Sequence, residues 1–228
     1  LEKLRGITDP EEKRKTIGHT FIEVFEKEAQ KKGPFEFLAQ WTLYPDWIES
    51  RSFKGPSATI KTHHNVGGLP KNMKLKLLEP MRSFYKDEVR AIGRALGLPE
   101  EFVNKQPFPG PGYAVRIRGE VTRERLKMEK KADEIVLSEL ENAGILQNVF
   151  LSFPVLTNAF STAVKGDGRN FGEVIAIRIV ESKDIMTSTW ARIPYDLMQK
   201  ISSRIVNEVE GVSRVVYDIT TKPPATME

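Results

Sequence analysis

The sequence contains no cysteine among its 228 residues. Disulfide bonds, thiolate metal sites and catalysis by a cysteine nucleophile are therefore excluded for this stretch of chain. It also lacks any run of about 18 apolar residues, the length that a membrane-spanning helix needs. The first residues, from Leu1 to Arg5, carry charges in place of the apolar stretch of a signal peptide, and the first of them is not methionine. We therefore expect a cytoplasmic protein with no membrane partner, and a chain that is processed or truncated.

The composition is that of an ordinary soluble protein, with 39% hydrophobic and 29% charged residues. The length suits one large domain or two modest ones. The formal net charge is +4 and the isoelectric point is near 9.1. A mild basic excess favours anionic partners such as nucleotides or nucleic acid. A solvated surface of mixed charges explains the same excess equally well.

The first half of the chain alternates helical and strand patterns. Polar capping residues and acids between Thr8 and Glu12 are typical of a helix start, and Gly33-Pro34 is typical of a helix end. The remaining patterns predict short buried strands over 35–39 and 75–78, a long surface loop over 45–68, and a helix from Lys86 to Gly97. This order of elements predicts an α/β layer arrangement.

The Pro/Gly segment at 107–112 is the candidate boundary between two domains, which we place at 1–112 and 113–228. The second part has the pattern of an α+β arrangement. Its residues predict a long helix after Thr122, strands over 148–155, 173–180 and 213–219, a polar turn over 165–169, and a helix from Pro194. Within that last helix, Leu197, Ile201 and Ile205 fall on one face and are expected in the core.

Three segments have residues that generic packing does not require. The first, Lys61-Thr62-His63-His64-Asn65, places a cation and two imidazoles beside the Gly67-Gly68 turn. The second, Gln106 to Gly112, alternates proline and glycine, which combines rigidity with close backbone approach. The third, Lys222 to Glu228, presents a lysine and a glutamate on a proline-stiffened tail. Together they indicate a site for a phosphorylated, planar substrate.

These segments and several others resemble, in the same order, the C-terminal part of the GMP synthetase family. The resemblance covers essentially the whole chain. The motifs that carry it are 38–40, Thr42-Leu43-Tyr44-Pro45-Asp46, Ile48-Glu49-Ser50, Ile60 to Asn65, Phe84 to Arg90, Pro107 to Gly112, Gly166-Asp167-Gly168-Arg169, Val180-Glu181-Ser182, Met186-Thr187, Arg214 to Ile219 and Lys222 to Glu228.

The resemblance implies ATP-dependent amination of xanthosine 5′-phosphate (XMP) to GMP through an adenylyl-XMP intermediate, with ATP and Mg²⁺. Ammonia would come from a glutamine amidotransferase domain or subunit, and the chain would form a homodimer. The implied fold is α/β: a truncated adenine-nucleotide α-hydrolase-like parallel sheet, the partial ATP-pyrophosphatase domain with its lid loop at 45–68, followed by a smaller α+β dimerisation domain.

Two departures from the family bear on activity. The S-G-G-V-D-S phosphate loop that begins the family's ATP-pyrophosphatase domain does not occur in this sequence, and Trp41 stands where the family has glycine. An indole at that position would block the nucleotide pocket or fill space beside a missing strand. We expect these 228 residues to be inactive alone, because the ATP phosphates lose their backbone cradle.

The resemblance also implies roles for individual residues, whereas no metal ligand set is assigned. Asp46 and Glu49 would hold a metal or orient ammonia from a mobile lid, and Lys165 and Arg169 are further candidates for the XMP phosphate. The catalytic set would be Asp46, Glu49, Lys61, His63 and His64, the nucleotide lid would add Arg51 and Thr62, and XMP would be bound by Pro109, Gly110, Arg116, Lys222 and Glu228.

Simpler interpretations stay open for each feature. A histidine pair on a loop is often solvent-exposed, a Pro/Gly run is often a linker, a terminus is often frayed, and residues 165–169 fit a plain hairpin turn. A non-catalytic module for dimerisation or XMP binding is the alternative function. Nucleic-acid binding is not expected, because no aromatic platform or recognition-helix pattern is visible.

Overall fold

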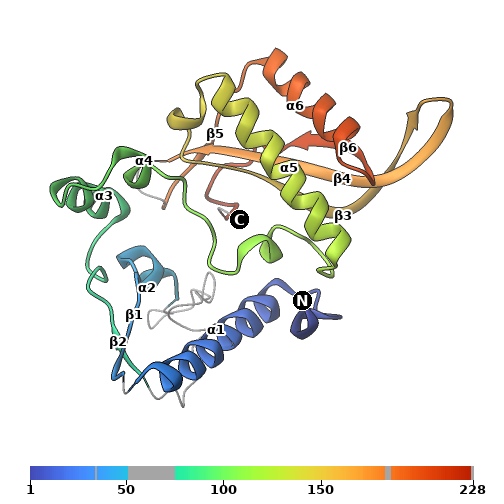
Figure 1. Cartoon of the computed structure of the whole chain (residues 1–228). Coiled ribbons are helices and arrows are strands. Elements are labelled where there is room, and N and C mark those ends of the chain that lie inside the picture. The colour runs from blue at the N-terminus through green and yellow to red at the C-terminus, as the bar shows by residue number, and fades with distance from the viewer. Residues whose placement is uncertain (34, 51–74, 183–185, 227–228) are drawn as a thin grey trace. The chain divides into compact units, whose positions relative to one another are not determined.

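The computed structural model describes residues 1–33, 35–50, 75–182 and 186–226. The protein is a mixed α/β structure with a small parallel sheet and a larger, mainly antiparallel sheet (Figure 1). It divides into a first unit, Asp9–Val103, and a second unit formed by Leu1–Thr8 with Asn104–Glu228. The division falls between Val103 and Asn104, whereas the expected domain boundary is at 112/113. The Pro/Gly segment at 107–112 therefore lies in the second unit.

The first unit begins with a long helix whose ends follow local capping rules. The Asp9 carboxylate accepts a hydrogen bond of 2.9 Å from the Glu12 N–H, and Gly33 closes the other end at φ +141°. Both ends are where the sequence predicts them. The elements of this unit are α1 (Pro10–Lys32), β1 (Phe37–Ala39), α2 (Tyr44–Ser50), β2 (Lys76–Leu78), α3 (Lys86–Ala95) and α4 (Glu100–Val103).

Two expectations for the first unit are wrong. Strands β1 and β2 pair in parallel, but they are largely exposed instead of buried. Parallel strands are buried when further layers cover both faces, and within the described residues these two strands pair only with each other. Residues 45–50 are helix α2 and not loop, and the Asp46 carboxylate accepts from the Leu43 N–H at 2.9 Å in its first turn.

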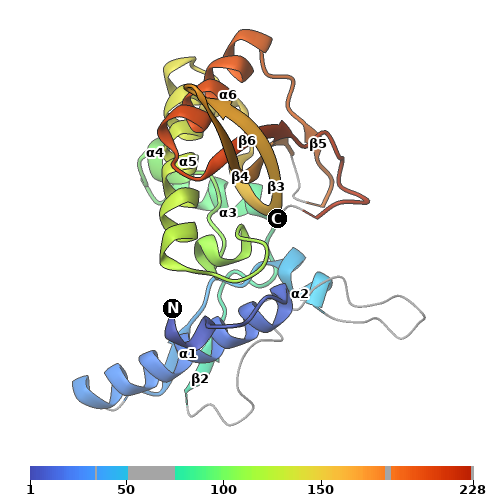
Figure 2. The same cartoon turned by 90° about the vertical axis from the view of Figure 1, so that its right-hand side faces the viewer.

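The second unit is a sheet with two helices across one of its faces, as the two views show (Figures 1 and 2). Strands β3 and β4 form a long hairpin, and β4 also pairs with β5 antiparallel and with β6 in parallel. The elements of this unit are the 3-10 turns η1 (Glu2–Leu4), η2 (Gly112–Val115) and η3 (Leu146–Asn148), helices α5 (Arg123–Asn142) and α6 (Tyr195–Glu208), and strands β3 (Leu151–Lys165), β4 (Gly168–Glu181), β5 (Thr189–Trp190) and β6 (Val212–Tyr217).

The core of the second unit lies between this sheet and helices α5 and α6. Ile135 and Leu140 of α5, Ile205 of α6 and Ile175 of β4 are completely buried. Each such side chain contributes about 1.5–3 kcal/mol relative to an exposed one. The predicted stripe of Leu197, Ile201 and Ile205 is confirmed as core.

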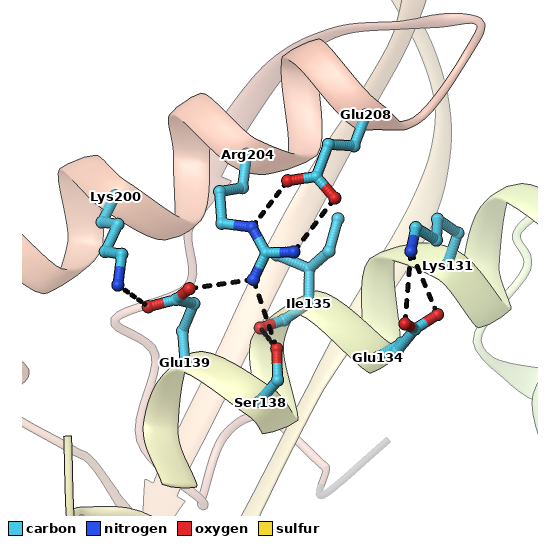
Figure 3. Close-up of polar contacts among 8 residues, drawn as sticks. All are labelled: Lys131, Glu134, Ile135, Ser138, Glu139, Lys200, Arg204 and Glu208. Carbon is cyan, nitrogen blue, oxygen red and sulfur yellow. Dashed lines mark hydrogen bonds and ion pairs between the residues drawn. The ribbon is translucent and has the colours of Figure 1, made fainter. Parts of the chain in front are cut away.

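Helices α5 and α6 are also joined by ion pairs around Glu139, which is 3% exposed (Figure 3). Its carboxylate lies 2.7 Å from Lys200 Nζ and accepts from Arg204 Nη1 at 2.8 Å. Arg204 also forms an ion pair with Glu208 on its own helix, in which Arg204 Nε lies 2.6 Å from Glu208 Oε1. The hydrogen bonds from Lys200 and Arg204 lower the pKa of Glu139 below its usual value.

We predict that Glu139→Gln makes stability less dependent on pH. A carboxylate whose pKa is depressed by folding contributes stability above its unfolded pKa, and this contribution is lost as pH falls through the folded value. The urea midpoint of the parent chain should therefore fall between about pH 7 and pH 4, and it should fall less in Glu139→Gln. Glu134→Gln is the control, since Glu134 pairs with Lys131 at the surface. Equal pH dependence in the parent and Glu139→Gln would contradict the prediction.

Candidate functional site

The Pro/Gly loop, residues 106–116, is tied to the sheet of the second unit at its start. The Gln106 side-chain oxygen accepts from the N–H and the hydroxyl of Ser152, both at 3.0 Å, and its amide donates to the Leu146 carbonyl at 3.3 Å. Inside the loop, the Gly112 N–H donates to the Pro109 carbonyl at 2.9 Å. Gly112 has φ +66°, a left-handed conformation that favours glycine. These bonds hold the loop against its own unit.

Arg116, at the end of this loop, is 2% exposed and lies among aromatic rings. Its guanidinium carbon is 4.5 Å from the ring centre of Phe153 and 5.0 Å from that of Phe108. Desolvated cation–π contacts of this kind are worth about 2 kcal/mol or more. The same guanidinium pairs with Asp133 of α5, Nη1 to Oδ1, at 3.5 Å. In this structure Arg116, the predicted phosphate-binding residue, therefore has its guanidinium paired with Asp133 and packed on rings of the second unit. Its role in binding phosphate stays a prediction.

Two buried carboxyl groups of α5 surround the single charge of Arg116. Burial raises the pKa of Glu129 well above its usual value, against the opposing charge of Arg116. Burial also raises the pKa of Asp133, which accepts from the Tyr113 hydroxyl at 2.9 Å. Burial and the neighbouring Asp133 raise the pKa of Tyr113 to about 12. Burial therefore disfavours the charged form of both carboxyl groups, and the positive charge of Arg116 opposes that effect.

The C-terminal tail, residues 218–226, is held by Arg178 of β4, which is 4% exposed. Its Nη1 donates to Asp218 Oδ2 at 2.7 Å and to the Thr220 carbonyl at 2.9 Å, and its Nη2 donates to the Thr226 carbonyl at 3.0 Å. Burial alone would raise the pKa of Asp218, but the Thr220 hydrogen bond and the charge of Arg178 keep it below its usual value. The tail is thus fastened on both sides of Lys222.

The loop and the tail meet the same face of the sheet at neighbouring positions. Phe153 of β3, which contacts Arg116, is the direct cross-strand partner of Arg178, which binds the tail. Directly opposed residues in an antiparallel pair project to the same face. The flanking Ile177 and Ile179 line a small cavity with Ile201 of α6, so the loop and tail face is the one turned away from α6.

Lys222 itself is half-buried and lies in a short backbone pairing with the segment before β5. Its N–H donates to the Ser188 carbonyl at 2.9 Å, and its carbonyl accepts from the Ser188 N–H at 3.0 Å. A frayed end, one of the open interpretations, does not describe this stretch of the tail. The predicted XMP residues Pro109, Gly110, Arg116 and Lys222 are thereby all placed in the second unit.

The predicted lid residues fall differently. Asp46 and Glu49 lie in α2 of the first unit. Burial and the charge of Arg90 lower the pKa of the neighbouring Lys86, and the negative charge of Asp46 partly offsets that lowering. Trp41 is 67% exposed, so it does not fill a space in the described core. Lys165 and Arg169 flank the turn of the β3–β4 hairpin, as the simpler interpretation has it. Six predicted residues lie outside the described residues: Arg51, Lys61, Thr62, His63, His64 and Glu228.

The described side chains form no cluster of metal-binding type. Within residues 1–33, 35–50, 75–182 and 186–226, no three histidine, aspartate or glutamate side chains gather as a metal site would require. The helices of the same ranges include none with the length and apolar character of a transmembrane segment.

The sequence did not identify the residues that support the Pro/Gly loop and the C-terminal tail. Tyr113, Asp133, Phe153 and Arg178 were not singled out as site residues, although each is central to the contacts of the loop or the tail. One signal was available for Arg178. It is a cation within the apolar run from Val174 to Val180, and a charge there is buried only when it is paired.

Comparison with known proteins confirms the predicted resemblance. Residues 138–228 match the family described as GMP synthase C terminal domain. The whole chain is 59% identical to part of the GMP synthase (glutamine-hydrolyzing) of a Nitratiruptor species, and 58% identical to those of Nitratidesulfovibrio vulgaris (strain DSM 19637 / Miyazaki F) and Aquifex aeolicus (strain VF5). The chain spans 44% of the length of each of these relatives.

Proposed function

We propose that this chain is the XMP-binding and dimer-forming portion of a GMP synthase subunit, a carbon–nitrogen ligase of purine nucleotide biosynthesis. The observation that carries the proposal is the similarity to GMP synthases over all 228 residues. The structure adds support of a different kind, because the two described segments expected to bind XMP lie against one sheet face.

The reaction would proceed in two displacements. The purine O2 of XMP attacks the α-phosphorus of ATP and pyrophosphate leaves, after which ammonia attacks C2 and AMP leaves. Lys222 would pair with the XMP phosphate, since charge-assisted hydrogen bonds to phosphate are strong. Pro109 and Gly110 would place the base and ribose, Glu228 would accept from the N–H edge of the purine, and Arg116 would add a further cation.

The lid would close over both nucleotides. Arg51 and Lys61 would neutralise phosphate charge with Thr62 beside them, and His63 and His64 would assist proton transfer near neutral pH. Mg²⁺, when bound with ATP, would supply positive charge against the phosphates. Asp46 and Glu49 are the candidates to hold that ion or orient ammonia. The hydrogen bond from the Leu43 N–H already fixes one carboxylate oxygen of Asp46.

The finer architecture belongs to the same proposal. We assign residues 1–112 to a partial ATP-pyrophosphatase domain of the adenine-nucleotide α-hydrolase type, and 113–228 to a dimerisation domain. The parallel pairing of β1 and β2 supports the first assignment. The protein would be a cytoplasmic homodimer that receives ammonia from a glutamine amidotransferase. Lys165 and Arg169 would face the XMP phosphate of the partner subunit.

A second candidate is a module that binds XMP and dimerises without catalysis. It applies to these 228 residues taken alone, which contain no S-G-G-V-D-S phosphate loop. Without backbone N–H groups around the ATP phosphates, the first displacement loses its charge stabilisation.

We predict that the 228-residue chain forms no measurable GMP from XMP, ATP, Mg²⁺ and ammonium. The same chain joined behind the upstream, loop-containing segment of the Nitratiruptor relative should form GMP at least about 10³-fold faster, because loss of even one oxyanion donor costs about 10²–10³ in rate. The assay is chromatographic detection of GMP. Robust GMP formation by these residues alone would refute the prediction that they are inactive. A fusion that folds but forms no GMP would favour the non-catalytic module.

A further inference from the structure

Arg178 stands out among the buried charges because its partners are far from it in sequence and close to a predicted site. The residue lies in the middle of β4, yet its guanidinium donates hydrogen bonds to Asp218, Thr220 and Thr226. These partners lie before and after Lys222. A guanidinium suits this task, because its planar fork donates in several fixed directions at once.

The tail also has contacts that do not involve Arg178, among them the hydrogen bond of 3.0 Å that the Thr221 hydroxyl donates to the Pro223 carbonyl. The backbone pairing with Ser188 holds the main chain of Lys222. The Ala225 N–H donates to the Thr221 carbonyl at 3.0 Å, which is a contact within the tail itself. The bond from Arg178 to Thr226 is a direct side-chain link from the sheet to residues beyond Lys222. The Ser188 pairing does not involve Arg178, so it should persist when that bond is lost.

The position of Arg178 also relates the tail to the Pro/Gly loop. Its cross-strand partner Phe153 contacts Arg116, the last residue of the loop. The register of one strand pair therefore sets both anchor points. Burial at 4% exposure keeps water from competing for the guanidinium donors.

We propose that Arg178 is a positioning residue for XMP binding: it holds the C-terminal tail against the sheet so that the tail meets the nucleotide in an ordered state. The proposal rests on the proposed function, in which Lys222 and the residues after it bind XMP. An ordered tail binds more tightly because the ordering cost is met before the ligand arrives.

The test compares Arg178→Lys with the parent chain in two measurements. Amide hydrogen exchange of Thr220 and Ala225 reports the tether without any ligand, and calorimetry reports XMP affinity. Lysine keeps the charge but cannot span the three acceptors, so exchange should speed up and XMP binding should weaken by about tenfold. Arg123→Lys, at an exposed arginine in the first turn of α5 in the same unit, is the matched control and should change neither.

A background that ends at Thr221 separates positioning from general damage to the fold. There the tail beyond Thr221 is absent, so Arg178→Lys should leave the remaining XMP affinity unchanged within about twofold. A persisting tenfold effect in this background would overturn the proposal, as would unchanged exchange in Arg178→Lys or faster exchange with parental affinity. If the parent chain does not bind XMP, the proposed function fails and this inference fails with it, whereas the exchange result still reports the tether.

Discussion

Replacement of Arg116 with methionine is expected to lower the free energy of unfolding by about 3–5 kcal/mol at neutral pH. The guanidinium is 2% exposed and faces two buried carboxyl groups, Asp133 and Glu129. Methionine fills much of the volume and keeps contact with the rings of Phe108 and Phe153. The loss therefore comes mainly from carboxyl groups left without a cation.

The same reasoning gives the loss a pH dependence with a definite sign. Burial already raises the pKa values of Glu129 and Asp133, and without Arg116 they should rise further. Folded protein then binds more protons than unfolded protein, so the stability of Arg116→Met should fall as pH rises through the unfolded pKa values toward the folded ones. The deficit relative to the parent should be smallest near about pH 4.

Urea denaturation followed by circular dichroism measures both effects. Arg118→Met is the control, because Arg118 is two residues away and its side chain is exposed. It should cost no more than about 0.5 kcal/mol, as surface changes usually do. Equal midpoints for the two variants would show that the buried cluster does not depend on Arg116.

Replacement of Lys222 with alanine is expected to weaken XMP binding by about 10- to 100-fold, the worth of hydrogen bonds to a charged group. The backbone pairing of Lys222 with Ser188 does not involve the side chain, so the tail should keep its course in the variant. Lys105→Ala is the control, since Lys105 is an exposed lysine just before the Pro/Gly loop. Calorimetric titration with XMP is the measurement. An unchanged dissociation constant in a folded Lys222→Ala chain would remove Lys222 from the site.

Local chemistry allowed several elements to be predicted from the sequence. Asp9 and Gly33 mark the ends of α1, Thr122 caps α5 by accepting from the Arg125 N–H, and the spacing of Leu197, Ile201 and Ile205 gives the buried face of α6. These signals depend on neighbours within about one or two helical turns, which a single sequence displays directly.

Burial in the first unit could not be predicted in the same way. The apolar composition of 35–39 and 75–78 is typical of covered strands, but burial depends on which layers pack over a strand, and β1 and β2 are exposed here. Phe21 and Phe25, part of the apolar spacing of α1, are likewise about half exposed, and their rings stack on each other.

The candidate site shows the same division between local and long-range information. The Pro/Gly loop and the tail could be recognised from their own residues. Their meeting on one sheet face depends on the pairing of Phe153 with Arg178, which the strand register determines and which no local pattern reports. For this reason the contacts of Tyr113, Asp133 and Phe153 became visible only in the structure, and the apolar run around Arg178 indicates its burial but not its partners.

The most direct test of the proposed role is calorimetric titration of XMP into the 228-residue chain in the absence of ATP. The account predicts saturable binding in the micromolar range, with much weaker binding of AMP, whose base lacks the 2-oxo group and the N–H edge that Glu228 would contact. A folded chain that gives no saturable binding of XMP would contradict it.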